Sequence, residues 1–391
     1  MLLLIIIYLS FISLGLPDSL LGSAWPSMYR GLNAPLHYAG AVFMIIAGGT
    51  VLSSILSEKI IRRFGTGAVT AASVLMTAAA LIGFSFSHSF WLLCLYAVPL
   101  GLGGGTVDVA LNNYVAAHYK ARHMSWLHCF WGIGASLGPI IMSRFLMNGG
   151  SWNAGYRTIG IMQFCLVALL CVSLPLWKGK DKSAATDAAG HLSPGFKKLF
   201  RLPGVKQALV AFFCYCAIET TTGLWSSSYL VTVKNIPPET AAQWSALFYI
   251  GITFGRFISG FATILFSNRQ MIRIGQIIIG GGILVLMLPL GRGALLPGLF
   301  MVGLGCAPVY PSLLHETPKN FGSAYSQSVM GIQMACAYIG TTLMPPIFGR
   351  LASYMSFSIL PLFLGIILII KIVMVETLYR KTAPNNKETP V

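Results

Sequence analysis

Long apolar runs dominate the chain and constrain its fold more than any other feature. A helix that crosses a bilayer needs about 20 mostly apolar residues, and lipid offers no partner for backbone groups outside a helix or closed barrel. The runs lie at 3–29, 37–57, 66–87, 90–117, 123–147, 157–177, 206–231, 240–265, 271–290, 294–315, 324–351 and 354–378. We therefore predict an all-α polytopic membrane protein with twelve transmembrane helices.

The charged residues agree with a membrane protein and indicate its orientation. Only 9% of the 391 residues are charged, whereas soluble domains average about 25%. The net charge of +16 would suggest nucleic acid in a soluble protein, but here Lys and Arg are about three times as frequent on the side that carries both termini. Basic residues gather on the cytoplasmic side. We expect a protein of the bacterial inner membrane with both termini in the cytoplasm. We also expect a monomer that is surrounded by lipid and binds no nucleic acid.

The runs fall into two halves that resemble each other. We predict a six-helix bundle at 1–177, a cytoplasmic linker at 178–205, a second bundle at 206–378 and a tail at 379–391. The acid-to-glycine spacing is four residues both at Asp18 and at Glu219. Duplicated halves with a binding site between them are typical of carriers that work by alternating access.

Three acids fall inside the apolar runs: Asp18, Asp108 and Glu219. An ionised carboxylate at the bilayer centre costs about 2.5 to 3.5 kcal/mol on insertion scales, so such acids usually serve function. Burial disfavours the charged form, and we expect Asp108 to bind and release the coupling ion, with Asp18 and Glu219 as further candidates. We expect the ion to be H⁺, although the same oxygens could bind Na⁺ and composition does not choose between them. Glu219 could serve either the ion or the substrate.

Two helix faces suggest contacts to substrate. Asp18, Gly22 and Trp25 lie at i, i+4 and i+7, a face that suits a hydroxylated ring. Asn112 follows Asp108 by one turn and offers an amide on the same face.

Further polar and aromatic residues are candidates with two interpretations each. His128 could relay protons, or it could hydrogen-bond a neighbouring helix. Tyr310 and Gln333 are expected to line the pocket. Arg256 is either a counter-ion for an acid or a side chain that extends to the cytoplasmic face. Trp131 is interpreted as a packing aromatic.

The motifs of enzymes are missing from the sequence. There is no phosphate-binding loop, no metalloprotease helix and no nucleophile elbow, and the eight cysteines lack metal-ligand spacing. We expect no enzymatic activity, no cofactor and no metal site.

The arrangement of six plus six spans resembles the major facilitator superfamily. The loop after the second span keeps Arg62 and Arg63, with Glu58 in place of the usual acid, and these residues, together with Arg256, are expected to act in gating. The acid in span one, G-x-G-x-x-x-x-D in span four and LHxFxGIGAxxGP in span five resemble fucose:proton symporters and sodium-dependent glucose carriers. The resemblance implies the major facilitator fold and symport of a monosaccharide or similar polyhydroxy solute, with Asp18 handling substrate and Asp108 coupling to protons.

Two alternatives stay open. The G-x-x-x-G-P segment from Gly134 to Pro139 also resembles part of the signature of drug exporters, which implies proton-driven efflux of amphipathic compounds. A transport-silent nutrient receptor, acting through the linker, is the third hypothesis.

Overall fold

The computed structural model describes residues 2–177 and 199–382, and over these residues it contains helices and no strand. The first bundle contains α1 (Leu2–Asp18), α2 (Leu20–Met28), α3 (Ala39–Phe64), α4 (Thr66–Ser85), α5 (Phe90–His118), α6 (Ala121–Leu146) and α7 (Trp152–Trp177). The second contains α9 (Val205–Thr232), α10 (Pro238–Leu265), α11 (Asn268–Met287), α12 (Leu295–Cys306), α13 (Val309–Phe321), α14 (Ser323–Tyr354) and α15 (Leu360–Thr382). Short 3₁₀ turns lie at Leu36–Tyr38, Met147–Gly149, Arg292–Ala294 and Phe357–Ile359.

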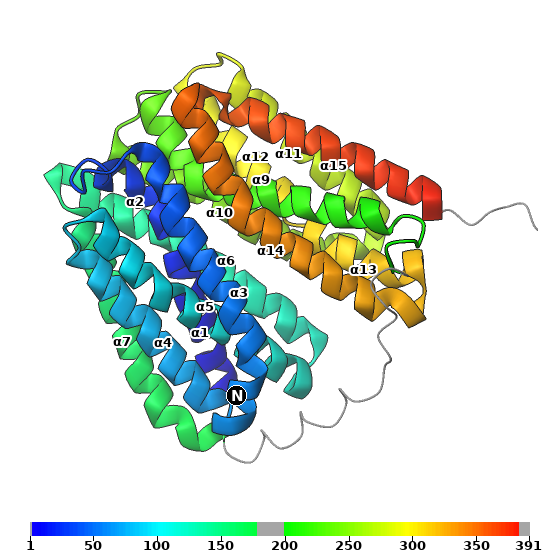
Figure 1. Ribbon diagram of the computed structural model, residues 1–391, viewed down its shortest axis with the longest axis horizontal. Helices are drawn as coiled ribbons and strands as arrows, with labels where there is room; N and C mark the ends of the chain where they lie inside the picture. The colour runs from blue at the N-terminus through cyan, green and yellow to red at the C-terminus, as the bar shows by residue number, and fades with distance from the viewer. Residues whose placement is uncertain (1, 178–198, 383–391) are drawn as a thin grey trace, which may run out of the picture.

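These helices confirm the predicted fold class. Among the described residues, eleven helical stretches are long and apolar enough to cross a membrane, and the 32-residue α14 packs among them as a less apolar twelfth (Figure 1). Spans one and ten each consist of two helices, α1 with α2 and α12 with α13. Residues 178–198 of the predicted linker and residues 383–391 of the predicted tail lie outside the described residues.

A proline explains why the first span is broken. Pro17 has no N–H, so the carbonyl of Ser13 loses the donor that a regular helix would supply. The side chain of Gln163 in α7 donates to that carbonyl at 2.8 Å, and the hydroxyl of Thr77 in α4 donates to the Gln163 carboxamide oxygen at 2.7 Å. This buried network fixes the end of α1, and Asp18 is its last residue.

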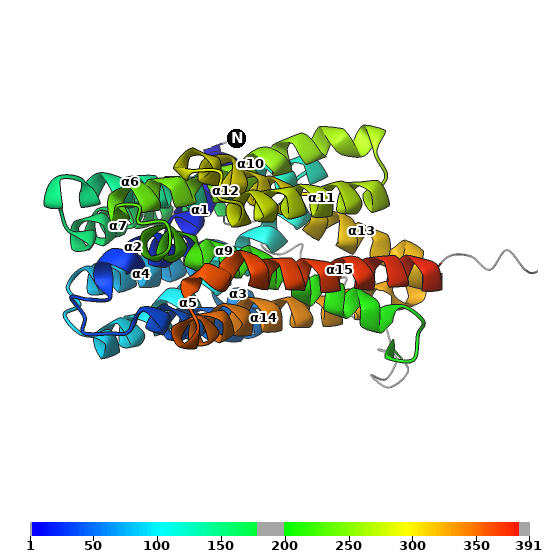
Figure 2. The same cartoon turned by 90° about the horizontal axis from the view of Figure 1, so that it is seen from above.

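The two bundles come into backbone contact where α2 meets α9. A Cβ atom at Gly22 would lie 2.5 Å from the carbonyl oxygen of Gly223, so only glycine allows the two backbones this close. The hydroxyl of Ser227 donates to the carbonyl of Ser23 at 3.4 Å beside this contact. From here the bundles diverge toward the ends that carry the N-terminus and α13 (Figure 1), while Figure 2 shows the same helices from above.

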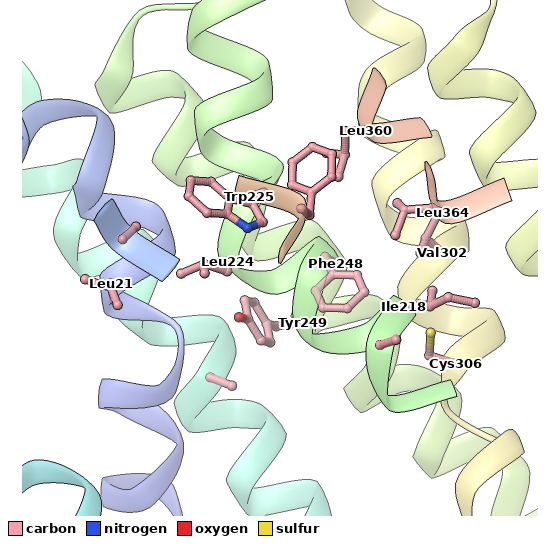
Figure 3. Packing of buried hydrophobic residues seen from close by; sticks show 14 of the residues in the cluster. Leu21, Ile218, Leu224, Trp225, Phe248, Tyr249, Val302, Cys306, Leu360 and Leu364 are labelled. Carbon is pink, nitrogen blue, oxygen red and sulfur yellow. The ribbon is translucent and has the colours of Figure 1, made fainter. Parts of the chain in front are cut away.

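Large buried side chains join the bundles into one continuous core. Leu21 of the first bundle and Leu224 of the second belong to the same buried cluster (Figure 3). Trp225 is fully buried beside them and donates to the carbonyl of Pro345 at 2.8 Å. The packing therefore fixes α2, α9 and α14 against one another at this end of the molecule.

The Gly22 contact can be tested by adding a single methyl group. With the native cysteines replaced and Ser23→Cys and Ser227→Cys introduced, we expect a short bifunctional reagent to link α2 to α9. Gly22→Ala should lower the cross-linking yield at least severalfold, because its Cβ meets backbone that cannot move aside. Gly48→Ala is the matched control, since a Cβ there meets nothing within 4 Å. Equal yields in the two variants would contradict the contact.

Candidate substrate and ion site

An acid of the first bundle bonds to a tryptophan of the same bundle in the middle of the molecule. The Nε1–H of Trp131 in α6 donates to Oδ2 of Asp18 at 2.8 Å. Asp18 remains accessible to solvent, although it lies within the first span. A hydrogen bond to a charged acceptor is worth about 1.5 to 3 kcal/mol, so the indole holds the carboxylate in a defined place.

A cation of the second bundle covers the other side of the same tryptophan. The guanidinium of Arg256 in α10 lies 4.8 Å from the centre of the Trp131 ring, a cation–π contact. Its NH2 group lies 3.7 Å from Oε1 of Glu219 in α9, a loose ion pair with both side chains about one-fifth exposed. Asp18, Trp131, Arg256 and Glu219 thus form an interbundle polar chain that runs from one bundle to the other.

The charges of this chain do not balance when both acids are ionised. Asp18 and Glu219 carry two negative charges, and Arg256 supplies one positive charge. Tyr249, two helical turns before Arg256 on α10, is buried and supplies no positive charge. In surroundings of low dielectric an uncompensated charge is costly, so this chain favours binding one more positive charge or proton.

The third acid lies nearby in the same region. Asp108 is half-buried on α5, and the side-chain amide of Asn112 donates to its Oδ1 at 2.8 Å. Asp108 interacts electrostatically with Asp18 and with Tyr310 of the second bundle. The predicted face of Asp108 and Asn112 is therefore present and belongs to the central region.

His128 and Tyr310 lie at the edge of this region. The ring of His128 packs edge-on against Phe11 at 5.9 Å and interacts electrostatically with Arg256. The hydroxyl of Tyr310 donates to the sulfur of Met334 at 3.1 Å, and its ring packs against Phe212. Both side chains are half-buried, and their roles stay predictions.

Three predicted substrate contacts lie elsewhere. Gly22 packs against α9, and Trp25 is fully buried and donates to the carbonyl of Leu36 at 2.5 Å. The stripe through Asp18 is interrupted because α1 ends at Asp18 and α2 begins at Leu20. Gln333 is 1% exposed, and its carboxamide oxygen accepts from the hydroxyl of Thr317 at 2.9 Å, so it connects α13 to α14.

The predicted gating residues form two separate groups. Arg62 pairs with Glu58 at 2.6 Å within α3, and both side chains are exposed, so this pair contributes little stability. Arg63 lies 5.4 Å from the centre of the Phe64 ring on the same helix. Arg256 lies in the central region instead, where its contact with Glu219 fits a counter-ion and not a side chain that extends to the membrane surface.

Sequence reasoning missed Trp131 and Tyr249. Both are aromatic residues in glycine-rich apolar helices, where most aromatics only pack. Their contacts to acids arise from tertiary structure, and no spacing in the sequence marks them. No group of three His, Cys, Asp or Glu side chains that could hold a metal ion occurs within residues 2–177 and 199–382.

Comparison with known families agrees with the observed bundles. The model of the Major Facilitator Superfamily matches residues 7–325 and, in an overlapping match, residues 208–390. The chain belongs to the Major Facilitator Superfamily. A crystal structure of a peptide transporter from this comparison superposes with a TM-score of 0.79 at 16% identity, covering 97% of this chain and 94% of the other.

Several curated relatives are similar in sequence. The chain is 26% identical over 285 residues to bypass of stop codon protein 6 of Saccharomyces cerevisiae, covering 66% of this chain and 56% of the yeast protein. It is 22% identical over 320 residues to the glucose/mannose transporter of Bacillus subtilis, covering 78% and 77%. It is 25% identical over 363 residues to a probable nitrate/nitrite antiporter of Thermus thermophilus, covering 83% and 75%. The protein is accordingly a multi-pass membrane transporter for a small molecule and not an enzyme.

The indole of Trp131 can be tested by removing its one polar group. Trp131→Phe keeps an aromatic ring near Arg256 but removes the donor to Asp18, and we expect gradient-driven uptake to fall at least tenfold, in line with the loss of about 1.5 kcal/mol or more. Uptake is measured in liposomes that contain equal amounts of folded protein.

Trp126→Phe serves as the control, because that side chain lies on the same helix and is 47% exposed. If both variants transport equally well, the bond between Trp131 and Asp18 does not matter for transport.

Proposed function

We propose that this transporter couples cation entry, of protons in the first place, to uptake of a monosaccharide or similar polyhydroxy solute by alternating access. The observation that supports this most strongly is the interbundle polar chain, in which Trp131 joins Asp18 of the first bundle to the Arg256–Glu219 pair of the second. We place both termini in the cytoplasm of a bacterium, in the inner membrane. In that orientation the diverging ends of the bundles face the cytoplasm.

Charge balance suggests how an ion could be coupled to the bundles. Asp108, Asp18 and Glu219 lie in one region, and Arg256 neutralises at most one of them. A proton on Asp108 or Asp18 would reduce the excess negative charge and allow the bundles to rearrange around the pocket. A Na⁺ ion held by the same oxygens would have the same electrostatic effect. H⁺ is the first choice because a single carboxylate can bind it, whereas Na⁺ needs several oxygen ligands.

The chemistry of the side chains favours a hydroxylated substrate. The carboxylate of Asp18 and the amide of Asn112 can accept and donate hydrogen bonds to hydroxyl groups, and the exposed part of Trp131 offers an apolar surface. The glucose/mannose transporter of Bacillus subtilis supports the same substrate class.

An anionic substrate is the second candidate. Arg256 is the central cation, its ion pair with Glu219 is loose at 3.7 Å, and a probable nitrate/nitrite antiporter is among the relatives. A carboxylate or nitrate could displace Glu219 and pair with the guanidinium. Efflux of amphipathic compounds and the transport-silent receptor remain further hypotheses that the same assay separates.

A panel of labelled solutes in proteoliposomes tests the function. Glucose, mannose, fucose, nitrate and tetraphenylphosphonium are each offered with an inward H⁺ gradient, with a Na⁺ gradient and with neither. We expect accumulation of at least one sugar that requires the H⁺ gradient. Nitrate exchange without sugar uptake would favour the second candidate, export of the phosphonium ion would favour efflux, and absence of all transport would favour the receptor.

The role of Asp108 is tested by separating exchange from accumulation. Asp108→Asn keeps the size of the side chain and removes its charge, so we expect sugar exchange to persist while accumulation against a gradient falls more than tenfold. Glu239→Gln, in the first turn of α10, is the control for loss of one acid. Normal accumulation together with normal exchange in Asp108→Asn would show that this acid does not couple transport.

A further inference from the structure

A lysine lies buried at the centre of the last helix. Lys371 is 0% exposed, and eleven residues of α15 precede it and eleven follow it. At 1.5 Å per residue each end of the helix is about 16 Å away. A lysine side chain is far shorter than this, so its amine cannot reach the water at either end. When charges are counted from the sequence alone, Lys371 is counted with the basic residues of the cytoplasmic side.

The packing of α11 against α15 shows what lies opposite the lysine. A Cβ at Gly280 would lie 3.5 Å from Leu368, and the Arg273 guanidinium donates to the Glu376 carboxylate at 2.7 Å. The helices are antiparallel, so Lys371 and Gln276 both lie in the layer between these two contacts. Gln276 is 3% exposed. It lies between Arg273 and Gly280, on the face of α11 that packs against α15.

Both side chains have nitrogen atoms without hydrogen-bond partners. Within the described part of the chain, neither Nζ of Lys371 nor Nε2 of Gln276 has an acceptor. The groups that interact electrostatically with Lys371 are the thiols of Cys214 in α9 and Cys306 in α12. An ammonium group carries three donors, and none of them has an acceptor among the described residues.

A neutral amine fits these surroundings better than an ammonium group. A buried amine without a partner leaves only a polar group unsatisfied, whereas an ammonium would be an unpaired charge inside the membrane. Transfer of a proton from a thiol to the amine would create two buried charges instead of none. The Arg273–Glu376 pair, at the edge of the layer, is already satisfied internally.

We propose that Lys371 is a proton-binding site inside the second bundle, neutral in this conformation and separate from the acids of the central region. Cys306 interacts electrostatically with Lys371 on one side and with Glu219 and Arg256 on the other, and it ends α12 at the break before Pro308. Proton binding itself does not depend on the proposed function, whereas a part in proton coupling does.

The test compares the pH dependence of unfolding in Lys371→Met and the unaltered protein, in detergent and without substrate. A lysine that is neutral when folded and charged when unfolded makes folding release a proton, so lower pH favours unfolding. We expect Lys371→Met to unfold a few degrees higher than the unaltered protein at pH 7 and at the same temperature near pH 10. Lys59→Met, at an exposed site on α3, should show no such pH-dependent difference.

A second measurement covers the case in which the variant folds poorly. In the unaltered protein labelled with ¹³C at lysine Cε, the signal that Lys371→Arg lacks should have the shift of a neutral amine at pH 9, where an ordinary lysine is still charged. A charged shift for this signal at pH 9, or a stability difference that stays constant from pH 7 to 10, would overturn the proposal.

Discussion

The contact of one tryptophan with an acid of its own bundle and a cation of the other is the interaction on which the central region depends. Trp131 holds Asp18 through its N–H and Arg256 through its ring, and Arg256 in turn reaches Glu219. Glu219 and Arg256 pair within the second bundle, whereas Asp18 of the first bundle is linked to Arg256 only through Trp131. The electrostatic surroundings of Asp18 thus depend on how the two bundles sit against each other, which is what coupling an ion to a conformational change requires.

Close backbone packing makes this arrangement possible. Gly22 allows α2 to meet α9, and a Cβ at Gly132 would lie 2.2 Å from the hydroxyl oxygen of Thr253, so α6 also approaches α10 closely beside Trp131. Small residues at helix contacts replace the hydrophobic driving force that lipid does not provide. The broken first span contributes as well. Because α1 ends at Asp18, that carboxylate stays accessible, and α2 packs into the core next to it.

The sequence predicts the features that depend on one helix at a time. Hydropathy locates the spans, and the one-turn spacing of Asp108 and Asn112 places them together because both lie on α5. The sequence does not predict contacts that depend on a neighbouring helix. Trp25 and Gln333 are polar-tipped residues on suitable faces, yet each is bonded to an adjacent segment in the core. No sequence pattern around Trp131 indicates its contact with Asp18. A count of basic residues does not indicate how deeply Lys371 is buried.

Binding-linked proton exchange is the most direct test of the account. Purified protein in weakly buffered detergent solution, with a pH-indicator dye, is mixed with the sugar that the liposome panel identifies. If substrate and proton share the region of Asp18, Asp108 and Glu219, sugar binding should take up protons in an amount that depends on the starting pH. Asp108→Asn should reduce this uptake. Tight sugar binding with no proton uptake at any pH between 5 and 9, and an affinity independent of pH, would contradict the proposed coupling.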